Sequence, residues 1–143
     1  MKKYVHLSLI AVFTLFSCET DTETGEESVH EWPSSISGCN ININLEDAEG
    51  ASVEAGLTIR YTFSLPSEQV SGVNPENGAT YTADSYSYDP LGNKGVVTLF
   101  YGQAAFEEYT LTPNSETGGT YTSESFNGAF SASSSGTYTY ICF

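Results

Sequence analysis

Hydrophobic and polar residues alternate strictly in two runs near the middle of the chain, residues 40–45 and 57–65. The apolar positions are Ile41, Ile43 and Leu45 in the first run, and Leu57, Ile59, Tyr61, Phe63 and Leu65 in the second. Successive side chains of a strand point to opposite faces, so a period of two residues places all the apolar ones on one face. Both runs therefore predict β-strands with one buried face.

Shorter runs rich in Tyr, Thr, Val and Phe continue this pattern, and these residue types favour pleated, half-buried surfaces. They lie at residues 80–83, 85–89, 96–101, 108–112, 120–126, 129–132 and 137–142. Residues typical of turns separate the runs, including Asn127-Gly128 and a predicted reversal at residues 133–136. No long window shows the 3.6-residue period of a helix. The pattern predicts an all-β, antiparallel meander of eight or nine strands.

Residues 66–79 are the longest stretch of the predicted domain without such alternation. They contain Pro66, Gly72, Pro75 and Gly78. Long ordered loops often carry function. We therefore expect a loop here, at the rim of the domain or as a lid over it.

A short element, Thr-Tyr-Thr, recurs along the chain. It stands at residues 80–82, 120–122 and 137–139, each shortly after a glycine, and residues 85–88 (Ser-Tyr-Ser-Tyr) are a variant. These residues resemble the strands of small secreted Tyr- and Thr-rich bacterial β domains, some of them calycin-like barrels. The resemblance covers residues 57–140 and implies an architecture, but no particular function.

The N-terminus has the features of an export signal. Lys2 and Lys3 precede a nearly uncharged stretch, residues 4–16, which is too short to span a bilayer as a permanent helix. Residues 15–18, Leu-Phe-Ser-Cys, resemble the lipobox of bacterial lipoproteins. The resemblance implies that residues 1–17 are removed and that Cys18, carrying a lipid, begins the mature chain. The alternative is an ordinary signal cleaved nearby, which would leave Cys18 as a free thiol.

Residues 18–31 form an acidic stretch in which Val29 is the one aliphatic residue after Cys18. Such a run cannot bury enough surface to offset its ordering entropy, so we expect a flexible tether. Residues 32–143 then form a single β domain. An acidic stretch after a lipidated cysteine also resembles the surface-export signal of Bacteroidota lipoproteins. It implies an outer-membrane anchor, on either the cell surface or the periplasmic face.

Cys39 and Cys142 are an even pair once Cys18 carries lipid. An oxidising compartment favours a disulfide between them. The bond needs Cα atoms within about 7 Å of each other, so it would place the first and last strands side by side. That closure favours a small calycin-like barrel. A β-sandwich whose terminal strands pair in one sheet is the alternative.

The charge of the chain restricts its partners. After removal of the signal, 18 acidic residues face two basic ones, Arg60 and Lys94, which gives a formal charge of −16. Such a field repels nucleic acid and anionic lipid headgroups. We expect no nucleic-acid partner, and attachment to the membrane through acyl chains alone.

The sequence offers little catalytic machinery. His30, in the predicted tether, is the one histidine after the signal, so a Ser or Cys nucleophile would have no histidine base in the domain. The neighbouring acidic pairs Glu46-Asp47 and Glu107-Glu108 would point to opposite faces of their strands, and we interpret them as solvated edge charges. We expect no enzyme activity, no cofactor and no metal site.

Tyrosines are the remaining candidates for ligand contact. Alternation places Tyr86 with Tyr88, and Tyr138 with Tyr140, on shared faces. Exposed tyrosines can stack on sugars or line a barrel mouth, although they also form ordinary cross-strand pairs. Trp32 is expected to plug the bottom of the core. The leading hypothesis is a lipid-anchored envelope module that binds a small apolar molecule or a glycan. The alternative is a structural or protein-interaction lipoprotein of the outer membrane.

Overall fold

The computed structural model describes residues 30, 32–50, 55–64 and 69–143. The predicted signal peptide, Cys18 and all of the predicted tether except His30 lie outside the described residues. Within the described ranges the chain forms nine antiparallel strands of a single sheet. No helix in these ranges has the length and apolar character needed to span a membrane.

The strands follow one another around the sheet as a meander. They are β1 (Cys39–Glu49), β2 (Thr58–Phe63), β3 (Val70–Val73), β4 (Thr80–Ala83), β5 (Ser85–Leu91), β6 (Lys94–Tyr101), β7 (Ala105–Ser115), β8 (Gly118–Asn127) and β9 (Phe130–Cys142). Their order in the sheet is β4-β3-β2-β1-β9-β8-β7-β6-β5. Each strand pairs with the next along the chain, except that β9 pairs with β1 and that β4 and β5 occupy the two edges.

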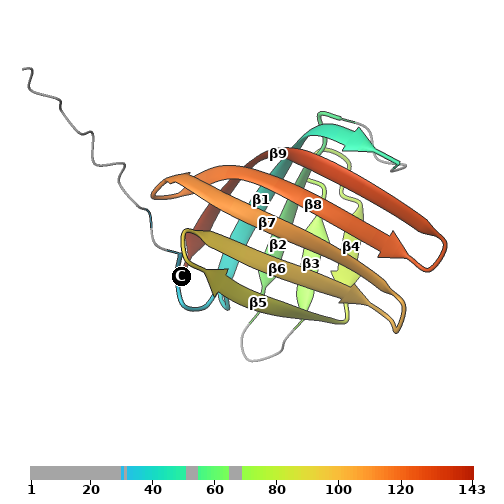
Figure 1. Ribbon diagram of the computed structural model, residues 1–143, viewed down its shortest axis with the longest axis horizontal. Coiled ribbons are helices and arrows are strands. Elements are labelled where there is room, and N and C mark those ends of the chain that lie inside the picture. Colours follow the sequence, from blue (N-terminus) through green and yellow to red (C-terminus); the bar gives the residue numbers. More distant parts are fainter. Residues whose placement is uncertain (1–29, 31, 51–54, 65–68) are drawn as a thin grey trace, which may run out of the picture.

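The two edges of the sheet meet through the chain itself. Only Asp84 separates β4 from β5, so the two strands act as one bent strand that pairs first with β3 and then with β6. At the bend, the backbone N–H of Asp84 donates to the carbonyl of Phe100 in β6, at 2.8 Å. The sheet therefore rolls into a nearly closed barrel, not a sandwich (Figure 1).

The alternating side chains predicted from the sequence fill the inside of this barrel. Ile41, Ile43 and Leu45 of β1 and Ile59, Tyr61 and Phe63 of β2 are all buried. Inward residues from the other half of the barrel complete the core, namely Val97, Leu99, Tyr109, Leu111, Tyr121 and Tyr138. Burial of apolar surface contributes roughly 25 cal/mol per Å², so this filled interior is the main source of stability.

The predicted disulfide is confirmed. Cys39 lies directly opposite Cys142 in the β1–β9 register, with Cα atoms 4.0 Å apart and an S–S distance of 1.96 Å. From this bond the pairing extends to Glu49 opposite Ser133, across a bulge between Leu45 and Asp47. The first and last strands thus close the barrel wall between them.

Two predictions about strands are wrong. Residues 66–79 were expected to form a loop. Residues 66–68 lie outside the described residues and residues 74–79 form the turn between β3 and β4, but Val70–Val73 form β3, a strand of four residues that is too short to show an alternating pattern. Residues 133–136 were expected to reverse the chain, but they continue β9, because their backbone pairs with β1 on one side and β8 on the other. Residues 70–73 and 133–136 therefore belong to the barrel wall.

The barrel has one closed end and one open end. At the closed end, where the disulfide lies, residues 32–38 cross the opening with Trp32 and Ile36 buried. The N–H of Gly38 donates to the carbonyl of Phe63, at 2.7 Å, and fixes this segment to β2. At the open end β1, β6 and β8 finish and β2, β7 and β9 begin. The described chain thus enters the barrel at the end opposite its mouth.

The disulfide should add to the stability that the packed interior provides, because it closes a loop of roughly 100 residues in the unfolded chain. We predict that the double variant Cys39→Ala/Cys142→Ala loses roughly 4 kcal/mol of unfolding free energy, measured by urea denaturation. After reduction of its disulfide, the parent protein should have nearly the same free energy of unfolding as the double variant. A loss below about 1 kcal/mol would mean that strand pairing alone closes the barrel.

Candidate functional site

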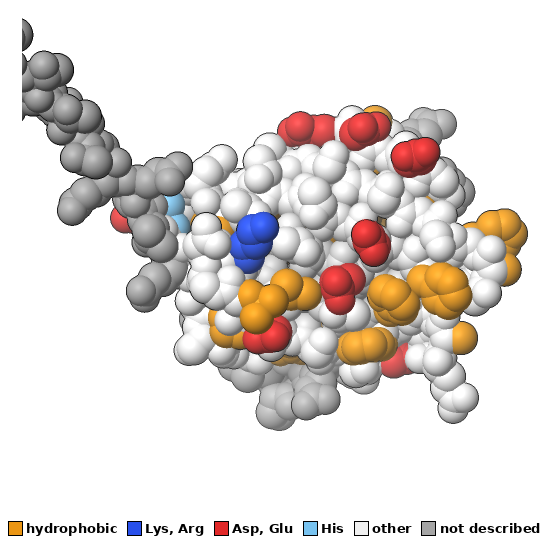
Figure 2. Space-filling model, viewed as in Figure 1, with side chains coloured by type: hydrophobic (Ala, Val, Ile, Leu, Met, Phe, Trp, Pro, Cys, Tyr) orange, Lys and Arg blue, Asp and Glu red, His pale blue; other side chains and the backbone are white. Residues whose placement is uncertain are grey.

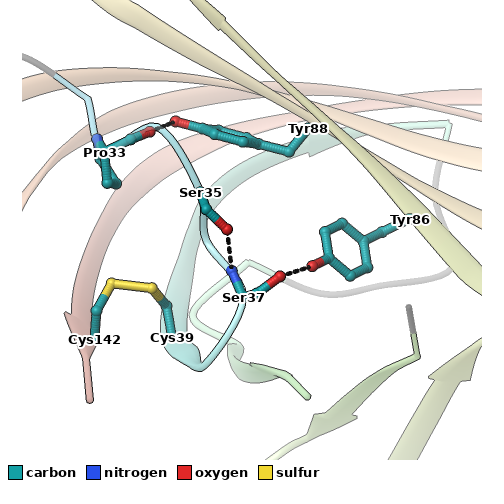
Figure 3. Close-up of a disulfide and its surroundings, with 7 residues drawn as sticks. All are labelled: Pro33, Ser35, Ser37, Cys39, Tyr86, Tyr88 and Cys142. Atoms are coloured by element: carbon teal, nitrogen blue, oxygen red, sulfur yellow. Dashed lines mark hydrogen bonds between the residues drawn. A yellow bond between two sulfur atoms is a disulfide. The ribbon is translucent and has the colours of Figure 1, made fainter. Parts of the chain in front are cut away.

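Two of the four tyrosines predicted to bind a ligand hold the segment that covers the closed end (Figure 3). The Tyr88 hydroxyl donates to the carbonyl of Pro33 at 2.6 Å, and the Tyr86 hydroxyl lies 2.7 Å from Ser37 Oγ. Both rings come from β5 and reach across the barrel end. These two hydrogen bonds fix residues 33–37 to the barrel wall.

The other two predicted tyrosines stack on Trp32. The ring centroids of Tyr138 and Tyr140 lie 5.6 and 5.2 Å from that of Trp32. On another side, the indole lies against Gly95, where a Cβ atom would come within 3.0 Å of the ring. The buried Trp32 Nε1 and Tyr138 hydroxyl have no hydrogen-bond partner among the described residues, so ring packing holds this plug.

Trp32 thus plugs the bottom of the core, as predicted. The structure brings Tyr86, Tyr88, Tyr138 and Tyr140 together at this end, in contact with the chain's own N-terminal segment. Tyr138 is only 1% exposed. A ligand-binding role for these four residues stays a prediction.

The open end of the barrel holds a cleft of about 580 Å³. Its floor and walls are inward side chains, namely Ile59, Tyr61, Tyr101, Glu107, Ser125 and Ala132. Aromatic residues form its rim, namely Tyr81, Phe106, Phe126 and Phe130. Below the floor is a cavity of about 70 Å³, which shares Glu107 and Ser125 with the cleft. We call the cleft and this cavity together the barrel mouth.

Glu107 lies where the cleft and the cavity meet, surrounded by tyrosine hydroxyls. Its Oε2 accepts hydrogen bonds from the hydroxyls of Tyr61, at 3.3 Å, and Tyr101, at 3.4 Å. The Tyr61 hydroxyl also lies 3.0 Å from that of Tyr109. Side chains from β2, β6 and β7 thus converge on one carboxyl group inside the barrel.

The alternation of β7 explains why this carboxyl group points inward. Glu107 shares a face with Tyr109 and Leu111, both of which are buried. Its neighbour Glu108 points outward, is exposed, and accepts a hydrogen bond from Thr98 at 3.2 Å. The interpretation of this pair as solvated charges therefore holds for Glu108 and is wrong for Glu107.

Burial raises the pKa of the Glu107 carboxyl group, because the barrel interior solvates the anion poorly. Hydrogen bonds from Tyr109, Tyr61 and Tyr101 stabilise the anion and act in the opposite direction. Burial also raises the pKa values of these three tyrosines, so they remain protonated donors at neutral pH.

No basic side chain of the described residues compensates Glu107. Arg60 is exposed and donates to Asn42 on the outer face, at 3.0 Å, while Lys94 is exposed in the turn at the closed end. A buried carboxylate without a counter-charge lowers the stability of the fold. Such groups are enriched at functional sites.

Gly72, in the strand that the sequence pattern did not predict, makes room for this arrangement. It lies directly opposite Tyr61 in the β2–β3 register, and a Cβ atom at Gly72 would come within 2.8 Å of the Tyr61 ring. The missing side chain lets the ring lie flat against β3 while its hydroxyl reaches Glu107.

Sequence reasoning missed Glu107 and its three tyrosines as a site. One signal was present: Glu107, Tyr109 and Leu111 follow the same period-two pattern as the core residues of other strands. Tyr101 precedes Glu107 by six residues across the β6–β7 hairpin. The approach of Tyr61, 46 residues away, depends on the barrel and carries no local signal.

Comparison of the chain with protein-family models, with curated proteins and with solved structures finds no match. Within the part of the chain that the structure describes, no group of three or more His, Cys, Asp and Glu side chains could hold a metal ion.

The raised pKa of Glu107 predicts a dependence of stability on pH. The folded chain holds this proton more tightly than the unfolded chain, so stability falls as the pH rises through the window between the two pKa values. Glu107→Gln cannot ionise and should remove this loss. We expect the variant to be more stable than the parent protein at neutral pH, and the difference to vanish towards pH 4, measured by urea denaturation.

Glu108→Gln is the matched control, since it removes the same charge from the outer face of the same strand. It should show no comparable gain. A Glu107→Gln variant that is less stable than the parent protein at neutral pH would contradict the prediction.

Proposed function

We propose that this protein is a lipid-anchored binding module of the cell envelope that holds a small organic ligand in the barrel mouth. The observation that carries the proposal is the cleft of about 580 Å³ at one end of a barrel whose other end is filled. Ligand sites typically measure roughly 300–1,000 Å³ and combine apolar walls with a few converging polar groups. Glu107 and its tyrosines supply such polar groups, and Ile59 and the aromatic rim supply apolar surface.

The direction of the mouth agrees with anchoring at the N-terminus. The described chain enters at the closed end, next to the disulfide, and the residues that line the mouth lie at the opposite ends of the strands. A lipid on Cys18 would hold the module from the closed end and leave the mouth accessible. A disulfide is also typical of proteins outside the cytoplasm.

A second candidate function, protein interaction, is favoured by an exposed aromatic strip on the outer face. Phe100, Phe106 and Phe126 lie directly opposite one another on β6, β7 and β8, and Phe130 is 76% exposed. Apolar side chains gather on this face towards the open end (Figure 2). Contiguous exposed apolar surface often marks an interaction site.

The anchor can be tested on the native protein. We expect mass spectrometry of the mature chain to show Cys18 as its first residue, carrying a diacylglyceryl group. Cys18→Ala should release the protein into the soluble fraction of lysed cells. Cleavage at another position, with an unmodified Cys18 thiol, would contradict the lipoprotein assignment.

The location of the site can be tested with a panel of small ligands and two matched variants. Ser125 lines the mouth, so Ser125→Phe should fill it and weaken binding at least tenfold by calorimetric titration. Ser87, on the exposed side of β5, is the control, and Ser87→Phe should leave binding unchanged. Tyr88→Phe removes the hydrogen bond to Pro33 and should lower stability but not affinity.

Binding lost in Tyr88→Phe but kept in Ser125→Phe would move the site to the closed end. Absence of saturable binding, with a co-purifying protein that Phe100→Ser releases, would favour the interaction role instead, because Phe100 belongs to the outer strip and does not line the mouth.

A further inference from the structure

Among the described residues that line the mouth, Glu107 is the one charged group, and its sign restricts the ligand. We infer that the barrel mouth recognises an amphiphilic amine, with its ammonium group on Glu107 and its apolar part against the aromatic rim. This inference rests on the proposed function and names the ligand class of the same site.

The carboxyl group retains acceptor capacity for a charged donor. The tyrosine hydroxyls that reach Oε2 do so at 3.3 and 3.4 Å, whereas strong hydrogen bonds from hydroxyls to carboxylates measure about 2.5–2.7 Å. An ammonium group has three donors and no acceptor. The carboxylate and the oxygens of Tyr61 and Tyr101 are acceptors around one position, and the Ser125 hydroxyl lines the same cleft.

Charge favours a cation over the other ligand classes. Ionised Glu107 has no basic partner among the described side chains of the barrel, so an ammonium group would supply the missing counter-charge. A carboxylate or phosphate would meet a like charge in a poorly solvated site. The formal charge of the chain, −14 before removal of the predicted signal, also attracts cations and repels anions.

The groups that face Glu107 give the expected dependence on pH. They are Tyr61 from β2, Tyr101 from β6, Tyr109 from its own strand and Tyr121 from β8. Burial raises the pKa values of all four tyrosines, so they stay neutral, and Glu107 is the group among them that titrates below neutral pH. A bound ammonium group requires the ionised carboxylate, and the affinity should fall as the pH falls through the raised pKa of Glu107.

The rim suits an apolar body of moderate size. Tyr81 shares the inward face of β4 with buried Ala83 and is 38% exposed at the cleft, and Phe130, on the same face of β9 as Ala132, is 76% exposed. Ile59 and Ala132 continue the apolar surface towards Glu107. An alkyl or aryl group extending from the ammonium group would lie along these side chains and bury apolar surface that is otherwise exposed to water.

The test compares three probes that share one apolar body: octylamine, octanol and octanoate, each titrated calorimetrically at neutral pH. We expect octylamine to bind at least tenfold more tightly than octanol, and octanoate to show no binding. Glu107→Gln should reduce the affinity for octylamine at least tenfold and leave that for octanol unchanged. Glu108→Gln, which removes the same charge from the outer face, should change neither.

The pH profile gives an independent readout. The parent protein should lose affinity for octylamine on acidification, and Glu107→Gln should show a flat profile. Because Glu107→Gln is expected to be at least as stable as the parent protein, unfolding would not account for a loss of binding; urea denaturation of the variant checks this.

Two results separate the inference from the function on which it rests. If octanol or octanoate binds as tightly as octylamine, and Ser125→Phe abolishes that binding, the mouth is the ligand site but the preference for an amine is wrong. If none of the three probes binds, the amine inference is wrong; if the wider ligand panel also fails, the proposed function is wrong with it.

Discussion

The pairing of β1 with β9 is the contact on which the barrel depends. The other ladders of the sheet join strands that follow one another along the chain, so each can form over a short loop. The β1–β9 ladder instead joins residues at opposite ends of the domain, from Cys39 opposite Cys142 to Glu49 opposite Ser133. Because it closes the longest loop, its loop-closure entropy is the largest in the fold. The disulfide joins Cys39 and Cys142 of this same ladder. Without this ladder the meander would be an open sheet with no enclosed mouth.

Side-chain size then divides the closed barrel into a filled half and a hollow half. Large residues such as Trp32, Phe63 and Tyr138 occupy the end nearest the disulfide. Towards the other end the inward positions of β8 and β9 become small, with Ser123 and Ser134 joined by a hydrogen bond of 2.7 Å. The space that these serines leave contains Glu107, whose buried carboxyl group does not stabilise the barrel. The large packed side chains that stabilise the fold lie at the end with the disulfide, and the polar groups of the candidate site lie towards the open end.

The alternating pattern was sufficient to predict most of the fold, because alternation reports directly which face of a strand is buried. It predicted the strand class and the inward residues of β1 and β2, while the plug position of Trp32 followed from its place at the start of the predicted domain. It failed for β3, which is short and is held by its neighbours, and for residues 133–136, whose small side chains suggest a turn when read alone. The candidate site was harder to predict. It forms where the β6–β7 hairpin, which carries Tyr101 and Glu107, meets Tyr61 of the distant strand β2, and no local pattern records that meeting.

The bend at Asp84 has a mechanical consequence for the mouth. Among the described residues, the junction of β4 with β6 is the one place in the ring without a ladder, and the backbone hydrogen bond from Asp84 to Phe100 spans it. This seam lies diametrically across from the disulfide-locked ladder. The barrel wall is therefore rigid at the β1–β9 ladder and more easily deformed at the β4–β6 seam. Thermal fluctuations of the rim, and any widening of the mouth for a larger ligand, would therefore be concentrated at the seam. The side formed by the β1–β9 ladder would keep its shape.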